Sequence, residues 1–202
     1  CASVTGWSAC VDSYADARRT ASTPGCASPT VCGRQRLQAR KPDWRASALE
    51  SLIKDVIFRT GAELAGHDRE TLARFADELP GRFDAVAACG ISDTLVHGDF
   101  HPGNFRGQGN ALTLLDWGDS GVGHPLLDQP AFLERAPDSE KEDVKNHWNN
   151  QCLSAWPGSN PARAAELLAP VAAARQAVIY RRFLDNIEPD EQIYHRADPA
   201  RW

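Results

Sequence analysis

Apolar residues recur three and four positions apart between residues 49 and 86, which is the spacing of amphipathic helices. The residues that carry this pattern are Leu49, Leu52, Ile53, Val56, Ile57, Leu72, Phe75, Leu79, Phe83 and Val86. We expect Gly66 to end a first helix and Asp68 to cap a second one. Pro80-Gly81 would interrupt the second helix, and Cys89-Gly90 would end it.

The hydrophobic period changes in the middle of the chain. Leu95-Val96-His97 is a short apolar run that predicts a buried strand. Phe105-Arg106 and Leu112–Leu115 predict two further strands, joined through Gly107–Asn110, which has the composition of a turn. After Pro125 the helical period returns. The order of helices, a small β element and more helices predicts an α+β fold.

Residues 1–42 show no sustained hydrophobic period and are rich in Ala, Ser, Thr, Arg, Gly and Pro. We therefore expect a poorly ordered or truncated leader, followed by one lobe over residues 43–202. The chain contains no methionine and begins with Cys1, so we expect a fragment of a longer protein.

Charge is distributed unevenly along the chain. Residues 1–45 carry seven Lys and Arg against three Asp and Glu, whereas the whole chain has a net charge of −5. An acidic main body would suit a cationic small substrate. The positive start is too sparse and too poor in aromatic residues to indicate nucleic-acid binding.

Cysteine usage and hydropathy indicate a cytoplasmic protein. No apolar run approaches the roughly 18 residues of a membrane helix, and no secretory signal is present. Four of the six cysteines lie in the first 32 residues without any C-x-x-C pair. This pattern favours reduced thiols over a zinc site or a disulfide framework.

Three oxygen-bearing side chains lie beside short apolar runs in the predicted β element. Asp99 comes first, Asn104 follows five residues later, and Asp116 follows twelve residues after that. A carboxylate on a tight loop can orient a hydroxyl group and accept its proton, which predicts Asp99 as the catalytic base. Amide and carboxylate oxygens suit magnesium, so Asn104 and Asp116 are predicted to bind Mg²⁺ and, through it, the phosphates of ATP.

Neighbouring polar residues have supporting roles in this prediction. His97 belongs to the catalytic set, where holding the loop by hydrogen bonds is favoured over a direct chemical role. His101 and Asp119 are candidate contacts to substrate or phosphate, and both also fit the ordinary roles of loop residues. Asp128 is expected to give structural support by anchoring the loop. The Gly121-x-Gly123 pair is expected to be a turn.

The segment from His97 to Asn104 resembles the catalytic loop H-G-D-x-x-x-x-N of the aminoglycoside phosphotransferase and choline kinase family, whose fold is related to the protein kinases. Leu115-Asp116-Trp117-Gly118 resembles the metal-binding strand end of that family, and Gly123–Asp128 resembles its G-x-P-x-x-D segment. The resemblance covers about residues 45–202. It implies the C-terminal catalytic lobe of a kinase, with Asp99 as base and with ATP and Mg²⁺ as cofactors.

The N-terminal part of the chain departs from this family. The family's N-terminal lobe is a β-sheet with a lysine that pairs with the nucleotide phosphates, and residues 1–42 lack such a pattern. None of the lysines lies in an apolar strand; they are Lys41, Lys54, Lys141 and Lys145. We expect the β lobe to be missing, through truncation or a shifted reading frame, and the chain alone to be weak or inactive. The apolar face of residues 95–117 would then be open to self-association.

The predicted function is transfer of the γ-phosphate of ATP to a hydroxyl group of a small, aminoglycoside-like or choline-like molecule. No nucleic-acid or membrane partner is expected. One alternative is a non-catalytic, degenerate kinase lobe, which the missing nucleotide lysine favours. Another is a metal-dependent hydrolase, because His97, Asp99 and His101 alternate and could join Asp116 and His124 in a metal site.

Overall fold

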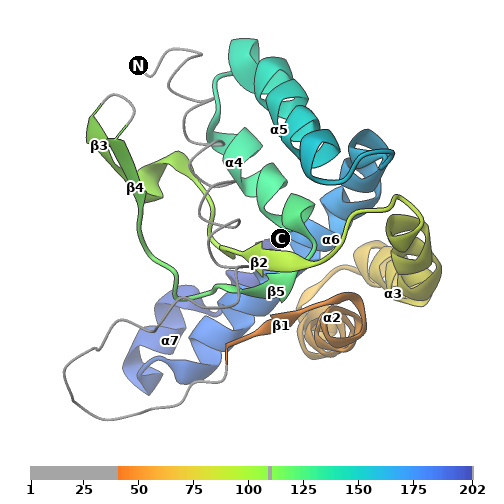
Figure 1. Ribbon diagram of the computed structural model, residues 1–202. Coiled ribbons are helices and arrows are strands. Elements are labelled where there is room, and N and C mark those ends of the chain that lie inside the picture. The colour runs from red at the N-terminus through yellow and green to blue at the C-terminus, as the bar shows by residue number, and fades with distance from the viewer. Residues whose placement is uncertain (1–40, 109–110, 202) are drawn as a thin grey trace.

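The computed structural model describes residues 41–108 and 111–201, so the predicted leader lies outside the described residues except for its last two positions, 41 and 42. The α-helices are α2 (Ala46–Thr60), α3 (Gly66–Ala87), α4 (Gln129–Arg135), α5 (Lys141–Ala155), α6 (Pro161–Asn186) and α7 (Pro189–His195). The strands are β1 (Asp43–Trp44), β2 (Thr94–Val96), β3 (Phe105–Gln108), β4 (Ala111–Leu114) and β5 (Gly121–Gly123). Short 3-10 turns are η1 (Gly61–Glu63), η2 (Pro102–Asn104), η3 (Pro125–Asp128), η4 (Asp138–Glu140) and η5 (Pro199–Arg201). The predicted α+β class is confirmed (Figure 1).

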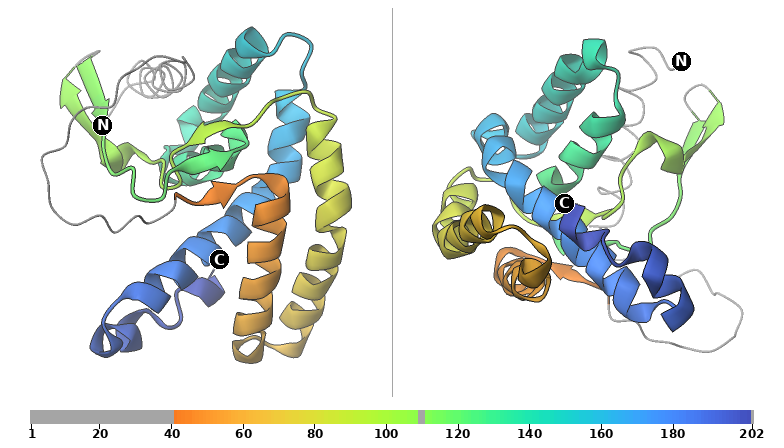
Figure 2. Two further views of the ribbon diagram at one scale, coloured as in Figure 1. Left: turned by 60° about the horizontal axis from the view of Figure 1, so that its bottom comes forward. Right: turned by 180° about the vertical axis from the view of Figure 1, so that it is seen from behind.

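Helix α6 is the central support of the lobe. Helices α2 and α3 run side by side, as the left view of Figure 2 shows, and α6 packs against both of them. Helix α6 also contacts α4, α5 and the η3 turn. One long helix therefore connects both helical groups with the segment that follows β5.

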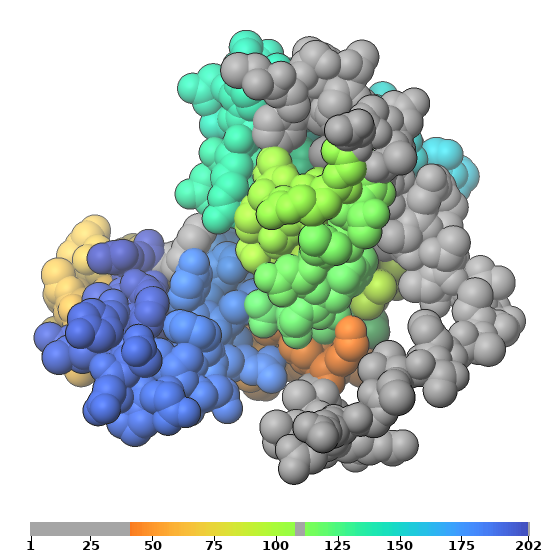
Figure 3. All heavy atoms as spheres, turned by 90° about the vertical axis from the view of Figure 1, so that its left-hand side faces the viewer, coloured from red at the N-terminus to blue at the C-terminus, as the bar shows by residue number. Residues whose placement is uncertain are grey.

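The strands form two small sheets rather than one. Strand β5 lies between β1, to which it is parallel, and β2, to which it is antiparallel. Strands β3 and β4 form a separate antiparallel hairpin in which Phe105 pairs with Leu114. The predicted strand near Leu95 and the predicted hairpin are confirmed. Figure 3 shows the hairpin and the segments around it at the centre of one face, between the α4–α5 side and the α6–α7 side.

Trp44 packs so closely on β5 that two positions of this strand have room only for glycine. Its side chain is 1% exposed and lies directly against the strand. A Cβ atom on Gly121 would lie 2.7 Å from Trp44 Cδ1, and one on Gly123 would lie 2.8 Å from Trp44 Cβ. The Gly121-x-Gly123 pair is thus a strand and not the predicted turn, because the two glycines allow β1 to approach closely.

Two predicted helix boundaries are wrong. Helix α2 ends at Thr60 instead of Gly66, and α3 begins at Gly66 with Ala65, not Asp68, at its cap position. Helix α3 also continues through Pro80, which is exposed, while Leu79 remains fully buried on the opposite face. Burial of the apolar face outweighs the backbone hydrogen bond that proline cannot donate.

An aromatic cluster attaches the predicted catalytic loop to the helices. Phe100 is fully buried and stacks on Phe132 of α4, with ring centroids 5.0 Å apart. It also meets Phe105 and Trp148 of α5 edge to face, at 5.4 Å in each case. Such pairs add about 0.5–1.5 kcal/mol beyond area burial, so this cluster stabilises the loop that contains Phe100.

Two further expectations concern thiols and membranes. Cys89 and Cys152 are both buried, and the other four cysteines lie outside the described residues. Across residues 41–108 and 111–201, no helix combines the length and the apolar character that crossing a bilayer requires.

Candidate active site

The backbone between β2 and Asp99 is held by one buried carboxylate. The amide of His97 donates a hydrogen bond of 2.7 Å to Asp128 Oδ2, and the amide of Gly98 donates one of 3.1 Å to Asp128 Oδ1. Gly98 has a φ of +91°, and a Cβ atom there would lie 2.7 Å from the Cβ of Asp119. Glycine is required because this turn combines a left-handed backbone with a close neighbour.

Asp128 is in turn held from α6, which the sequence analysis did not predict. Arg175 Nη2 donates to Asp128 Oδ1 at 3.0 Å and to the Leu127 carbonyl at 2.9 Å. Gln176 Nε2 donates to the Gly98 carbonyl at 3.3 Å. Asp128 and Arg175 are both completely buried. Because neither charge is hydrated, each is stabilised by the opposite charge of the other. The sequence signal for these contacts from α6 is the Arg175-Gln176 pair, which interrupts an otherwise apolar stretch of that helix.

His97 connects the catalytic loop with the strand end before Asp116. Its Nδ1 accepts a hydrogen bond from the Asp99 amide at 3.3 Å, and its Nε2 lies 2.8 Å from the Leu115 carbonyl. Because Nδ1 accepts, Nε2 is the nitrogen that donates to Leu115. The imidazole is fully buried and packs on Trp117 with centroids 4.7 Å apart. This placement fits the predicted role of holding the loop.

Asp99 and Asn104 lie side by side at the loop. Asn104 Nδ2 donates to the Asp99 carbonyl at 2.9 Å and to Asp99 Oδ2 at 3.2 Å. The Asn104 carbonyl accepts a hydrogen bond of 2.8 Å from the Leu115 amide. The loop is therefore connected to the Asp116 segment twice, through His97 and through Asn104.

His101 is the nearest imidazole to the predicted base. Its Nε2 lies 3.4 Å from Asp99 Oδ2, and its Nδ1 accepts a hydrogen bond from the Gly103 amide. Burial lowers the pKa of His101, and the nearby Asp99 carboxylate only partly opposes this effect. His101 is accordingly neutral at physiological pH.

The turn after β4 presents two more carboxylates. Asp116 is exposed and has a φ of +61°, the only left-handed non-glycine residue within the described part of the chain. Aspartate tolerates this conformation better than most residues, and such strain is typical of functional sites. Burial raises the pKa of Asp119, and the negative charges of Asp99 and Asp116 raise it further. Three carboxylates thus share one region.

The chemistry of these donors suits magnesium. Because Asn104 uses its amide nitrogen to hold Asp99, its amide oxygen is the atom available to a cation. Together with Asp116 it offers a hard, oxygen-only pair of donors of the kind that magnesium prefers. The described residues contain no group of three or more His, Cys, Asp or Glu arranged around one metal position. Mg²⁺ commonly binds through one or two carboxylates plus substrate phosphates, so Asn104 and Asp116 fit this mode.

The geometry behind the hydrolase alternative is absent from the structure. Strand β2 ends at Val96, so His97, Asp99 and His101 do not continue it on one shared face. The Nδ1 atom of His124 accepts a hydrogen bond from the Leu126 amide at 3.2 Å, away from the catalytic loop.

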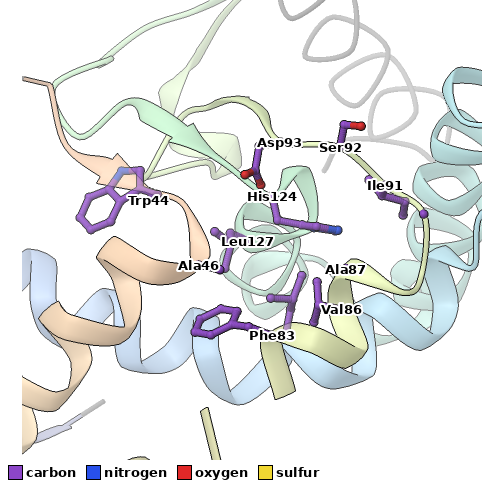
Figure 4. A pocket seen from close by; sticks show the side chains of 12 residues that line it. Trp44, Ala46, Phe83, Val86, Ala87, Ile91, Ser92, Asp93, His124 and Leu127 are labelled. Carbon is purple, nitrogen blue, oxygen red and sulfur yellow. The ribbon is translucent and has the colours of Figure 1, made fainter. Parts of the chain in front are cut away.

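A pocket of about 450 Å³ lies on the α2–α3 side of the lobe (Figure 4). Its walls include Trp44, Phe83, Asp93 and His124, and burial raises the pKa of Asp93. Asp99 and the predicted metal ligands do not line it. This pocket is therefore separate from the predicted chemistry.

Each lysine of the chain has a hydrogen-bond or ion-pair partner other than these three carboxylates. Lys41 donates to Ser120 Oγ at 2.6 Å. The other three lysines form ion pairs within their own helical segments: Lys54 with Glu50, Lys141 with Asp138, and Lys145 with Glu142. The structure, like the sequence, therefore assigns no lysine to the nucleotide phosphates.

The fold and this arrangement define a kinase-like catalytic lobe. Residues 27–167 match the phosphotransferase enzyme family, and the match covers well over half of the chain. The chain belongs to this family, as the resemblance of its catalytic loop implied. A search of curated proteins finds no match.

Proposed function

We propose that this lobe transfers the γ-phosphoryl group of ATP to a hydroxyl group of a small molecule. The observation that carries the proposal is the double connection between the Asp99 loop and the Asp116 segment, through His97 Nε2 and the Leu115 carbonyl and through the Leu115 amide and the Asn104 carbonyl. These bonds bring one candidate base and two candidate cation ligands together without any further rearrangement.

Asp99 acts as the base in this mechanism. Its Oδ2 is oriented by Asn104 and accepts the proton of the substrate hydroxyl group as that oxygen attacks the γ-phosphorus. The new bond joins the substrate oxygen to phosphorus, the bond from phosphorus to the β-phosphate oxygen breaks, and ADP leaves. His97 keeps the Asp99 backbone in place and does not exchange the proton itself, because both of its ring nitrogens are engaged in the buried network.

Asn104 and Asp116 would hold Mg²⁺ through their side-chain oxygens. The ion, when bound, neutralises charge on the phosphates and on the leaving group. Asp116 suits this role because it is exposed, and its left-handed backbone turns the chain sharply at the end of β4.

We expect the substrate to be an amine-bearing alcohol of the aminoglycoside or choline type. Asp99, Asp116 and Asp119 concentrate carboxylates in one region, and after burial the charges of Asp99 and Asp116 are the next causes that raise the pKa of Asp119. A cationic substrate would be attracted to this region. His101 and Asp119 are the proposed contacts to the substrate or its phosphate.

A second candidate function is a lobe that binds nucleotide or a partner without turnover. The observation that favours it is that no lysine is assigned to a nucleotide phosphate: three lysines pair within their own helical segments, and Lys41 donates to Ser120 Oγ. In this case magnesium-dependent ATP binding would occur without phosphoryl transfer.

The test is a phosphoryl-transfer assay with the full chain, ATP, Mg²⁺ and a panel of amino alcohols, including choline and an aminoglycoside. We expect transfer that is weak in this chain but measurable, and that Asp99→Asn reduces by about a hundred- to ten-thousand-fold, the usual contribution of a general base. Asp77→Asn makes the same chemical change on an exposed site of α3 and should leave the rate unchanged. ATP binding without transfer to any alcohol would support the second candidate, and a rate unaffected by Asp99→Asn would refute the proposed base.

A further inference from the structure

The pocket of about 450 Å³ in Figure 4 is formed by several parts of the chain. They are the β1–α2 junction, the last turns of α3, the segment just before β2, the η3 turn and α6. The volume is within the usual range for small-molecule sites. None of the proposed catalytic groups lines the pocket, so a ligand bound there would lie apart from phosphoryl transfer.

Most of the pocket wall is apolar. Phe83 and Ala87 of α3 are half-buried and exposed, respectively, so both offer surface to a ligand that enters from solvent. Val86 and Leu168 are 5% and 1% exposed and line the deeper part. The pocket therefore favours a ligand with a compact apolar body.

Asp93 supplies the only carboxylate among the described residues that line this pocket. The residue is exposed, so a ligand can reach its oxygens. Figure 4 shows its side chain across the pocket from Phe83 and Val86. Within the described part of the chain, the carboxylate forms neither a hydrogen bond nor an ion pair. An accessible acceptor with a full charge thus faces an apolar wall.

No lysine or arginine from the described residues lines the pocket to match this charge. Arg45 attracts Asp93 from outside the pocket, but its guanidinium is already bound to Asp43 through two hydrogen bonds of 2.9 and 2.6 Å. The Nδ1 atom of His124 accepts from the Leu126 amide, so the ring has its proton on Nε2 and is neutral. Burial accordingly raises the pKa of Asp93, and Arg45 opposes this effect only in part.

We propose that this pocket binds a small primary amine with a compact apolar body, of the arylalkylamine type. The ammonium group would donate a charge-assisted hydrogen bond to the Asp93 carboxylate, while the apolar body packs against Phe83 and Ala87. An anion would be repelled, and a neutral ligand would leave the carboxylate without a countercharge. This site goes beyond the proposed phosphoryl transfer, because it shares no residue with the proposed catalytic set.

Benzylamine is a suitable probe, with two matched controls. Benzyl alcohol has nearly the same shape without the charge, and methylamine has the charge without the apolar body. The experiment is a titration of the ¹⁵N-labelled full chain with each compound, followed by backbone amide NMR shifts. We expect saturable benzylamine binding in the millimolar range, with shifts at residues 83–93 and 124–127. Benzyl alcohol should bind about three- to tenfold more weakly, as expected for the loss of one partly exposed ion pair, and methylamine should not saturate in this range.

Asp93→Asn tests the carboxylate directly, because asparagine has the same shape without the charge. This variant should bind benzylamine no better than benzyl alcohol. Asp84→Asn is its control, since Asp84 is an exposed carboxylate beside Phe83 on α3 and does not line the pocket. Ala87→Leu should fill part of the opening and weaken both aromatic compounds by similar factors. Circular dichroism establishes that each variant is folded.

Several results would overturn the proposal. One is equal affinity of the native chain for benzylamine and benzyl alcohol, and another is a preference for the amine that persists in Asp93→Asn. Shifts centred on the Asp99 loop would place the amine at the proposed catalytic site instead. An equal loss of preference in Asp84→Asn would mean general attraction to an acidic surface and no specific site at Asp93.

Discussion

The loop from His97 to Asn104 and the turn from Leu115 to Asp119 supply the proposed catalytic groups, yet the protein holds them in opposite ways. The loop is fastened through its backbone by a fully buried carboxylate that a fully buried arginine holds in place. In the turn, Asp116 is exposed and left-handed, and the nearby Asp119 has a raised pKa. Asp99 and Asn104 are thus held in place by the loop, whereas Asp116 would gain stability only when a cation binds.

Arg175→Met should cause the largest loss of stability, because it removes the support of the loop. The change leaves the Asp128 carboxylate buried without its countercharge, which typically costs roughly 3–5 kcal/mol. Urea unfolding of the full chain measures the loss. Arg181→Met is the control, because Arg181 pairs with Asp185 one helical turn away at the partly exposed surface and should cost less than about 1 kcal/mol. Equal losses of stability in the two variants would mean that the buried Asp128–Arg175 pair contributes no more than a surface ion pair.

Gly98→Ala should have the next largest effect. The new methyl group would meet Asp119 in a backbone conformation that alanine rarely adopts, so we expect a destabilisation of about 2 kcal/mol or more and displacement of Asp99. Gly81→Ala is the matched control, since a Cβ atom there meets nothing within 4 Å inside α3. Alanine at that position should stabilise the helix by about 1 kcal/mol. Thermal unfolding of both variants checks the opposite signs, and similar behaviour of the two would contradict the account of the Gly98 turn.

The smallest effect concerns Asp119 and pH. Its folded-state pKa is raised by burial and by Asp99 and Asp116, so its ionised form destabilises the folded chain. The penalty is absent below the pKa of an unfolded aspartate and develops as the pH rises through the raised folded-state value. Asp119→Asn should therefore increase stability near neutral pH and lose this advantage in acid. Urea unfolding at several pH values tests this, and a variant that is less stable than the native chain at neutral pH would contradict it.

The residues of the catalytic loop and of the Asp116 turn could be predicted from the sequence. The motif residues Asp99, Asn104 and Asp116 lie beside short apolar runs, and the runs near Leu95 and Leu112 form strands as predicted. These features depend on local period and composition, which one sequence contains.

The supports of the site were harder to predict because they depend on contacts between distant residues. Arg175 reaches the catalytic loop across 77 positions of the chain, and no local pattern specifies such a pairing. The glycines of β5 were interpreted as a turn because their reason, the close approach of Trp44, comes from 79 positions before Gly123. Pro80 was expected to break a helix that tertiary packing in fact continues.

The central claim is that Asn104 and Asp116 form one cation site beside Asp99. A titration of the ¹⁵N-labelled full chain with Mn²⁺, in place of Mg²⁺, tests it through paramagnetic broadening of nearby amide signals. The account predicts that broadening begins together at the 99–104 loop and the 116–119 turn, and that Asp116→Asn removes it while Asp77→Asn does not. Broadening centred elsewhere, or unchanged in Asp116→Asn, would contradict the claim.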